Sequence, residues 1–461
     1  MPTTLVRNGL VVTASESGVA DLYVDGGKVA LIGQGLSLPA DTVVDASGCL
    51  VIPGGIDAHT HLDMPAGDLV SADDFETGTR AAAFGGTTTV VDFATPEPGQ
   101  SLLAAKETWM RKAEGKAGID YGFHMAVREV DDARLAEMAR LTRDEGVTSF
   151  KLYLAYPGVL QVDDASFFRA LLGARECGAL TLVHAENGGV IDVLVRRALA
   201  RGETAPRFHA LTRPPETEAE ATARAIALAG MAGAPLYVVH LSCAAALGHV
   251  AAARDRGLPV FAETCPQYLF LSIADYDRPG FEGARYVMSP PLREAADQEA
   301  LWTGLRGGDL QVVSTDHCPF TLAEKARGEG DFSRIPNGAP GIETRMMLLW
   351  DGGVRPGRID PQRFVELTAS APARIFGLWP RKGTIAVGSD ADLVVWDPER
   401  EVRLSAETLH MRVDHNPYEG RVVHGGPAVV LSRGEVVVDR GEWKGRPGRG
   451  QFLKRQRCLP S

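Results

Sequence analysis

The sequence predicts an α/β fold, a TIM-like (β/α)8 barrel with a small β-sandwich domain formed by the N- and C-terminal segments. Two observations support this prediction. In the central part of the chain, eight short apolar segments alternate with helical patterns rich in Ala, Leu, Arg and Glu, which is typical of parallel strands joined by helices. At both ends, short strand-like segments are separated by turn residues, and neither end alone offers much of a core.

The N-terminal segment, residues 1–52, is predicted to form short strands. Asn8-Gly9 and Asp25-Gly26-Gly27 are typical hairpin turns, because these residues accept positive φ angles. The strands expected around the turns are Thr4–Arg7, Leu10–Thr13, Asp21–Val24, Lys28–Ile32 and Thr42–Asp45.

The C-terminal segment, residues 383–461, has the same character. Its expected strands are Ala391–Asp397, Arg421–His424, Ala428–Ser432 and Glu435–Val438. We expect both segments to build one β-sandwich domain, because a small β unit needs the apolar residues of both. The basic end of the chain, from Gly441 to Ser461, is short of core residues. We expect this segment either to form a solvated tail or to contact a neighbouring subunit.

Residues 53–382 are predicted to form the barrel. The expected strands are Val51–Ile56, Thr88–Ala94, Tyr121–Val127, Thr148–Leu154, Leu180–His184, Leu236–Leu241, Val260–Glu263 and Leu310–Thr315. The clearest helical patterns are Ala72–Phe84, Asp131–Glu145, Ala165–Cys177, Glu216–Ala232 and Ala244–Arg256. A doubly wound open sheet is the alternative, but the strand count and the length of this region favour the barrel.

The composition argues against several classes of partner. A net charge of −11 disfavours nucleic acid or an anionic membrane as the main partner. No apolar stretch is long enough to span a bilayer, and the N-terminus lacks the layout of a signal peptide. The six cysteines include no Cys-x-x-Cys pair, so we expect reduced thiols in a cytoplasmic protein.

The pair His59 and His61 follows the first predicted barrel strand. Residues i and i+2 of an extended chain point to the same side, so both imidazoles could bind one metal ion. An isolated pair of this kind is also explained by two histidines on a surface loop. The function of a barrel resides at the carboxyl ends of its strands, so the other strand ends decide between the two interpretations.

Four further strand ends carry polar residues of the kind that binds metals. They are Lys151, His184, His240 and Asp316. Each alone has a structural explanation, such as a helix cap for Asp316, but their convergence at one end of the barrel predicts a metal site. We leave out His317, which should point away from Asp316, and interpret His124 as a core residue.

Lys151 is the unusual member of this set, because a protonated amine has no lone pair. Burial beside metal ions would lower its pKa. The neutral amine could then add carbon dioxide, and the resulting carbamate has two oxygens that suit a bridge between two metals.

Seven motifs of the chain resemble the amidohydrolase superfamily and, within it, the dihydropyrimidinase and D-hydantoinase group. They are Gly-Ile-Asp-Ala-His-Thr-His, Phe-Lys-Leu-Tyr-Leu-Ala-Tyr, Val-His-Ala-Glu-Asn, Val-His-Leu-Ser, Met-Ser-Pro-Pro-Leu-Arg, Thr-Asp-His-Cys-Pro-Phe and Ile-Pro-Asn-Gly-Ala-Pro-Gly-Ile-Glu. They come in the order of the family, and the resemblance runs nearly from end to end. It implies a homotetramer or homodimer that acts on a small cyclic amide in pyrimidine degradation or a related reaction.

The resemblance also implies a role for each site residue. It places two divalent metal ions in the site, with zinc as the first expectation and manganese or cobalt as alternatives. One metal is bound by His59, His61 and Asp316, and the other by His184 and His240. N-carboxylated Lys151 bridges the two metals.

The same resemblance assigns the chemistry. A hydroxide made available by the metals attacks an amide carbonyl of the ring, and Asp316 acts as general acid and base. Tyr156 donates to the developing oxyanion. Ser289 and Asn337 hold the imide edge of the substrate, largely through backbone groups, although both also sit in turn contexts.

The expected substrates are 5,6-dihydropyrimidines and 5-substituted hydantoins. The products would be N-carbamoyl-β-alanine, from dihydrouracil, and N-carbamoyl amino acids. Asp63 stands where dihydroorotases of this superfamily carry an arginine for the substrate carboxylate. Leu62, Met64, Tyr153 and Leu154 are expected near the exocyclic substituent. An allantoinase-type hydrolase and a non-catalytic assembly protein of the same fold are the alternatives.

Overall fold

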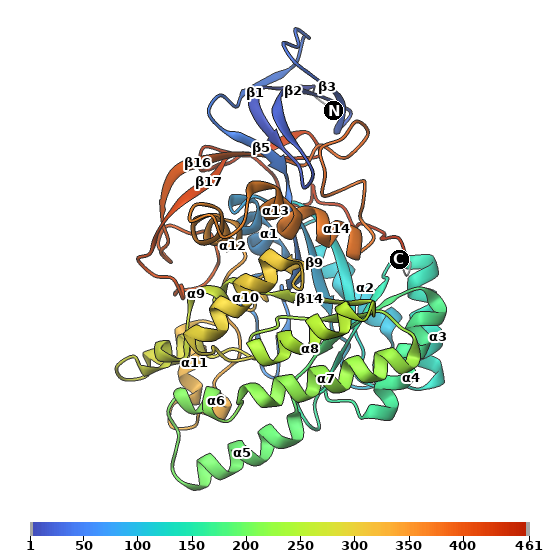
Figure 1. Ribbon diagram of the computed structural model, residues 1–461, viewed down its shortest axis with the longest axis vertical. Helices are drawn as coiled ribbons and strands as arrows, with labels where there is room; N and C mark the ends of the chain where they lie inside the picture. The colour runs from blue at the N-terminus through green and yellow to red at the C-terminus, as the bar shows by residue number, and fades with distance from the viewer. Residues whose placement is uncertain (1–2, 458–461) are drawn as a thin grey trace.

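The computed structural model describes residues 3–457. Its terminal strands gather at one end of the molecule, and the barrel with its surrounding helices forms the other end (Figure 1). Helix α5 (Gly188–Ala200) lies at the end remote from the terminal strands (Figure 1). Among residues 3–457, no helix combines the length and the apolar character needed to cross a bilayer.

The two ends of the chain form one nine-stranded sheet, in the order β19-β18-β17-β16-β5-β1-β2-β3 with β4 paired to β1. The antiparallel pairing of β5 with β16 joins the N-terminal strands to the C-terminal ones. The strands are β1 (Thr4–Val12), β2 (Ser17–Asp25), β3 (Lys28–Gly33), β4 (Thr42–Asp45), β5 (Leu50–Pro53), β16 (Leu393–Arg403), β17 (Val422–Ser432), β18 (Glu435–Asp439) and β19 (Glu442–Trp443).

This sheet curls so that its two halves share a core. The Oγ1 atom of Thr4 donates to the carbonyl of Gly434 over 3.1 Å, and the N–H of Ala391 donates to the carbonyl of Gly27 over 2.9 Å. Apolar side chains from both ends of the chain, including Val24 and Leu431, pack in one cluster. The prediction that both termini build one β unit is therefore confirmed, whereas the division at residues 52 and 382 stays a prediction.

The barrel is a parallel eight-stranded sheet in the order β15-β14-β13-β12-β11-β10-β9-β6. Its strands are β6 (Gly55–Thr60), β9 (Thr87–Ala94), β10 (Asp120–Ala126), β11 (Ser149–Tyr153), β12 (Leu180–His184), β13 (Leu236–Val238), β14 (Val260–Thr264) and β15 (Val312–Val313). The first and last strands meet where the N–H of His61 donates to the carbonyl of His317 over 2.9 Å. The prediction of a (β/α)8 barrel is confirmed.

The predicted strand Val51–Ile56 is wrong in one respect, because the chain changes sheets within it. Residues up to Pro53 belong to the terminal sheet, and residues from Gly55 onward belong to the barrel. Between them, a Cβ on Gly54 would lie 2.1 Å from the Oγ1 atom of Thr88. Glycine is needed here because the backbone passes directly over β9.

Helices surround the barrel, and several begin at a carboxylate or amide cap. Asp74, Asp131, Asp163 and Asn187 each accept a backbone N–H at a helix start. The helices besides α5 are α1 (Phe75–Phe84), α2 (Leu102–Ala113), α3 (Asp132–Arg140), α4 (Asp164–Cys177), α6 (Arg207–Leu211), α7 (Pro215–Ala232), α8 (Ala244–Asp255), α9 (Pro266–Phe270), α10 (Ala295–Gly307), α11 (Leu322–Lys325), α12 (Arg345–Leu349), α13 (Pro361–Val365) and α14 (Ala371–Ile375).

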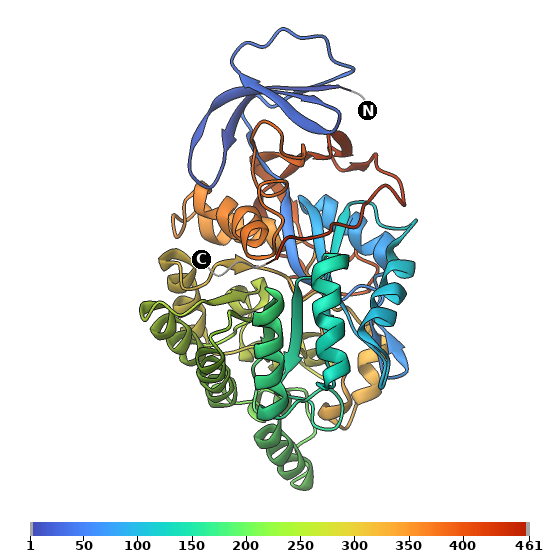
Figure 2. The same cartoon turned by 90° about the vertical axis from the view of Figure 1, so that its right-hand side faces the viewer.

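The C-terminal segment packs on its own barrel, so a solvated tail is wrong for residues 441–457. Phe452 forms an isolated parallel β-bridge with Tyr121 near the start of β10, and Leu453 is buried. Arg455 donates to the Oγ atom of Ser149 over 2.8 Å. In Figure 2 this dark red segment crosses the barrel at the end that faces the terminal sheet. Residues 458–461 lie outside the described residues.

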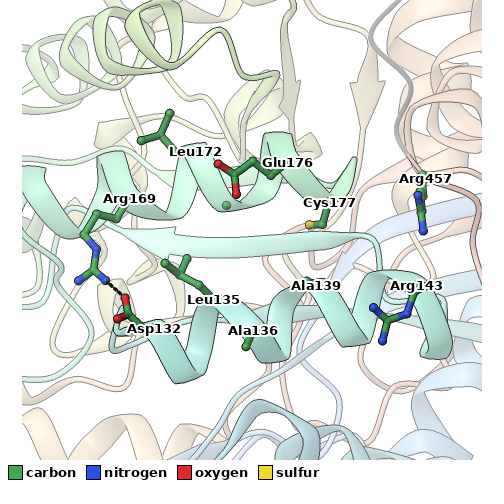
Figure 3. Close-up of a pocket in the computed structure, with 11 residues that line it drawn as sticks. Asp132, Leu135, Ala136, Ala139, Arg143, Arg169, Leu172, Glu176, Cys177 and Arg457 are labelled. Carbon is green, nitrogen blue, oxygen red and sulfur yellow. Dashed lines mark hydrogen bonds and ion pairs between the residues drawn. The ribbon is translucent and has the colours of Figure 1, made fainter.

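A groove of about 640 Å³ lies on the outside of the barrel between α3 and α4 (Figure 3). Leu135 and Leu172 line its apolar part, and an ion pair of 2.6 Å joins Arg169 to Asp132 at one end. Arg457 lies at the other end (Figure 3). None of the predicted site residues lines this groove, so the predicted chemistry lies elsewhere in the molecule.

Candidate metal centre and substrate cavity

All nine predicted site residues line one cavity of about 720 Å³. They are His59, His61, Lys151, Tyr156, His184, His240, Ser289, Asp316 and Asn337. The cavity lies at the carboxyl ends of the barrel strands, where residues that are far apart in the sequence come together.

His59, His61 and Asp316 form the first cluster, with ligating atoms that all lie within 4.8 Å of one another. The Oδ1 atom of Asp316 is 3.0 Å from Nε2 of His59 and 3.1 Å from Nε2 of His61. Nε2 of His59 is buried, yet within the described part of the chain it makes no well-oriented hydrogen bond. Two imidazole nitrogens and a carboxylate oxygen that face one point fit a divalent metal ion.

His184 and His240 form the second cluster, at the ends of the neighbouring strands β12 and β13. Nδ1 of His184 lies 2.9 Å from Nε2 of His240. The other ring nitrogen of His184 lies 2.8 Å from Oε2 of Glu186, which directs Nδ1 toward His240. A carboxylate on the far nitrogen is the usual arrangement behind a metal-binding histidine, so this pair also fits a metal ion.

Lys151 lies on β11 within the same cavity and is 1% exposed. Its Nζ atom is 4.7 Å from the centre of the Phe93 ring and 5.0 Å from that of Tyr153. Burial among these rings lowers the pKa of Lys151 to about 8, although Asp316 and Glu263 oppose the shift. A substantial fraction of the amine is therefore neutral near physiological pH.

Burial also keeps two of the histidines neutral. It lowers the pKa of His61 to about 4 and holds the pKa of His240 well below the usual range. For His59, burial is outweighed by the carboxylates of Asp316 and Glu263, which raise its pKa to about 9. A divalent ion would take the place of that proton, because it carries the positive charge that the carboxylates attract.

Glu263 is a site residue that no sequence motif singled out. One oxygen of its carboxylate contacts Nδ1 of His59 and accepts the N–H of His240 over 3.1 Å. The other oxygen accepts the hydroxyl of Tyr237 over 2.9 Å. Its position at the end of the seventh predicted strand is the signal that could have found it, because the predicted metal ligands also stand at strand ends.

Three of the nine residues have left-handed backbone conformations. The φ angles are 67° at Tyr156, 39° at His240 and 53° at Asp316. Such angles are uncommon for residues other than glycine and concentrate at functional sites. Here each one lies two or three positions after the end of a barrel strand and lines the cavity.

The three residues expected to bind substrate line the same cavity, on loops rather than strands. Burial raises the pKa of the Tyr156 phenol, so it stays protonated at neutral pH. Oγ of Ser289 lies 3.4 Å from Nε2 of His209. Oδ1 of Asn337 is buried and has no hydrogen-bond partner in the described part of the chain.

The two histidines that the sequence analysis left out of the metal site, His317 and His124, make hydrogen bonds outside it. Nε2 of His317 lies 3.1 Å from Oδ2 of Asp73, and its Nδ1 accepts the N–H of Gly341 over 3.1 Å. Nε2 of His124 lies 3.0 Å from the carbonyl of Ala58. Both rings are fully buried and support the fold.

The residues expected near the exocyclic substituent divide into two groups. Met64 and Tyr153 line the cavity. Leu62 and Leu154 do not, because they are fully buried in the hydrophobic core. Asp63 does not line the cavity either, and its carboxylate lies 3.7 Å from Nζ of Lys112.

Known proteins share this chain's sequence and fold over nearly its whole length. The D-hydantoinase of Streptomyces coelicolor is 55% identical over 461 residues, which cover 99% of this chain and 98% of that relative. The D-hydantoinase of Geobacillus stearothermophilus is 53% identical over 454 residues, 98% of this chain and 96% of the relative. A crystal structure of dihydropyrimidinase from Brevibacillus agri superposes with a TM-score of 0.98 at 52% identity and covers 100% of both chains.

The family assignment follows from a match over most of the chain. The sequence pattern of the amidohydrolase family matches residues 50–437. This range contains the whole barrel and every residue that lines the cavity. The chain therefore belongs to the amidohydrolase family and is a hydrolase, as its motifs predict.

Proposed function

We propose that the protein hydrolyses the cyclic amide bond of 5,6-dihydropyrimidines and of 5-substituted hydantoins with two bound divalent metal ions. The observation that carries this proposal is the pairing of two ligand clusters around buried Lys151 in one cavity. Relatives named D-hydantoinase and dihydropyrimidinase support the substrate class.

The residues that would hold the metals follow from the two clusters. His59, His61 and Asp316 would bind one ion, and His184 and His240 would bind the other. Nitrogen and carboxylate donors suit zinc, manganese or cobalt, and zinc is our first expectation. When bound, these ions would lower the pKa of water and polarise the amide carbonyl.

Lys151 would supply the ligand that joins the two clusters. Its buried amine has a lowered pKa, so the neutral form can attack carbon dioxide. The nitrogen forms a bond to carbon and loses a proton, and the product is a carbamate anion. The carbamate replaces a repelled cation with two oxygen donors, which explains a lysine among metal ligands.

Asp316 would move the proton during ring opening. Its carboxylate lies between His59 and His61 at the cavity wall. Burial would raise its pKa, but the charge of His59 and the hydrogen bonds from both rings outweigh burial and keep the pKa of Asp316 well below the usual range. It would accept a proton from the attacking water and deliver it to the leaving ring nitrogen.

Tyr156 would stabilise the charge that builds on the carbonyl oxygen. Its phenol stays protonated because burial raises its pKa, and a protonated hydroxyl can donate to an oxyanion. Ser289 and Asn337 would hold the imide edge of the ring, and Oδ1 of Asn337 lacks a partner among the described residues.

The cavity also has apolar walls that suit a substituent at ring position 5. Met64, Val159, Leu160, Phe320 and Ile335 line it. Apolar or aromatic substituents would pack there, and each methylene would change specificity by only about 1–3 kcal/mol. An arginine for a substrate carboxylate is missing at position 63, which argues against a dihydroorotase.

The test combines metal analysis with ring-opening assays on the purified protein. We expect two equivalents of metal per chain and turnover of dihydrouracil and 5-substituted hydantoins, with allantoin turned over slowly or not at all. A preference for allantoin would favour the allantoinase-type alternative. No bound metal and no ring opening would favour a non-catalytic assembly protein. Light scattering would test the homotetramer or homodimer that the resemblance implies.

A further inference from the structure

Lys325, the last residue of α11, is fully buried beneath the loops that carry Ser289 and Asn337. Its Nζ atom donates to the carbonyl of Val287 over 3.0 Å and to the carbonyl of Pro336 over 2.9 Å. A buried ammonium or amine that bonds only to backbone carbonyls is costly. Its effect is to join two segments that are far apart in the chain.

Both acceptors stand next to residues proposed to bind the imide edge. Val287 lies two positions before Ser289, and Pro336 directly precedes Asn337. The two segments also meet directly, because the N–H of Gly338 donates to the carbonyl of Val287 over 3.0 Å. One carbonyl therefore accepts from both Lys325 and the Asn337 loop, and it ties the two loops at a single point.

His209 supports the Ser289 loop from another element. Its ring is buried, and Nε2 lies 2.8 Å from the carbonyl of Met288. Lys325 and His209 thus hold the carbonyls of two consecutive residues, Val287 and Met288. Both side chains therefore hold the Ser289 loop, and of the two it is Lys325 that also bonds to the loop of Asn337.

We propose that Lys325 is a positioning residue that sets the separation of Ser289 and Asn337 and thereby the fit of the substrate's imide edge. This inference rests on the proposed function, because it assumes that these loops bind a cyclic imide. The imide includes the bond that breaks, but its second carbonyl keeps its bonds during ring opening, so contacts to that carbonyl contribute nearly equally to the ground state and the transition state. Loss of Lys325 should therefore raise KM and leave kcat nearly unchanged.

The test compares the metal-loaded wild-type protein with Lys325→Met, whose side chain is similarly long but has no donor. We expect KM to rise by about tenfold, and kcat to change by less than about threefold, for both dihydrouracil and hydantoin. The factor by which KM rises should be similar for the two substrates, because both rings contain the same imide. Lys106→Met is the matched control, because Lys106 is also buried but bonds to Glu107 and Glu145 outside the cavity. Its KM should not change.

Hydrogen exchange supplies a readout that does not depend on turnover. In Lys325→Met, the amides of residues 287–289 and 337–339 should exchange faster, and Gly338 should show the largest change because its N–H bonds to Val287. If Lys325→Met does not fold, Lys325→Gln, which keeps one amide donor, is tested by the same criteria.

An unchanged KM with unchanged exchange would overturn the inference, and so would a fall in kcat at constant KM. Failure of the proposed function looks different: the wild-type protein would then open neither ring, whereas faster exchange in Lys325→Met would still support the positioning of the loops.

Discussion

The carboxylate of Glu263 lies in direct contact with the imidazole of His59, Oε1 against Nδ1, although the two residues are 204 positions apart. Both side chains are buried. The contact leaves Nε2 of His59 as the ring atom that faces Asp316. A carboxylate behind a metal-binding histidine fixes its tautomer and orientation, so Glu263 should influence metal retention without being a ligand.

Glu263→Gln should weaken metal binding by about 10–100-fold, because the amide holds the His59 ring less strongly than the carboxylate does. The measurement is the metal-to-protein ratio after dialysis against graded chelator concentrations. Glu343→Gln is the matched control, since Glu343 is also buried and its Oε1 lies 2.8 Å from Nδ1 of His410 outside the cavity. Equal metal retention in both variants would contradict this role of Glu263.

Lys151→Ala should abolish measurable turnover and lose at least one metal per chain, because the bridging oxygens disappear with the amine. Metal analysis and the ring-opening assay check both effects. With ¹³C-labelled bicarbonate, a carbamate carbon signal should appear in the wild-type protein and be absent in the variant. Retention of both metals by the variant would refute a bridging Lys151.

Asp316→Asn should keep the fold and reduce kcat by about 10²–10⁴-fold, because the amide cannot accept and return the proton. Asparagine is the appropriate replacement, since it tolerates the left-handed φ of 53° at this position. Circular dichroism and the thermal midpoint provide the folding control. Turnover close to the wild-type rate would exclude Asp316 as the proton carrier.

Tyr156→Phe should lower kcat by about 10²–10³-fold, the usual effect of removing one oxyanion donor. KM should change little, because the hydroxyl is needed mainly in the transition state. Steady-state kinetics on one hydantoin and on dihydrouracil would measure the effect. Tyr286→Phe, at a buried tyrosine that does not line the cavity, should leave kcat unchanged. A rise in KM alone would assign Tyr156 to substrate binding.

Asp390→Asn should destabilise the protein by about 1 kcal/mol at pH 7, because the charge-assisted bonds to Arg381 and Lys382 weaken. Although burial opposes the shift, Lys382 and Arg381 lower the pKa of Asp390 in the folded state. Its contribution is therefore complete above the unfolded pKa of about 3.9 and is lost as the pH falls through the folded pKa. The difference in thermal midpoint between wild type and variant should narrow below about pH 4. A constant difference would contradict this linkage.

Much of the barrel and of its site could be predicted because the information is local. The alternation of apolar strands with helices predicts the eight-stranded sheet, and residues at the strand ends must meet at one mouth. Each of the six predicted ligands lies in the carboxyl-terminal part of such a strand or just after it, so their convergence in one cavity follows from the topology. They are His59, His61, Lys151, His184, His240 and Asp316.

The contacts that hold the site residues in place could not be predicted from the sequence in this way. Glu263 and Lys325 look like ordinary charged residues in the sequence, and only the folded chain brings them to His59 and to the carbonyls of Val287 and Pro336. The same holds for Leu453, which packs on the barrel although the basic segment around it resembles a solvated tail.

The sequence by itself determined which polar residues meet in the cavity of this protein, because residue type and strand position are both encoded locally. The tertiary structure alone decided how those residues are held: the change of sheet at Gly54, the carboxylate behind His59 and the lysine beneath the substrate loops. These contacts join residues far apart in the chain, so their partners become neighbours only when the barrel closes and water is excluded.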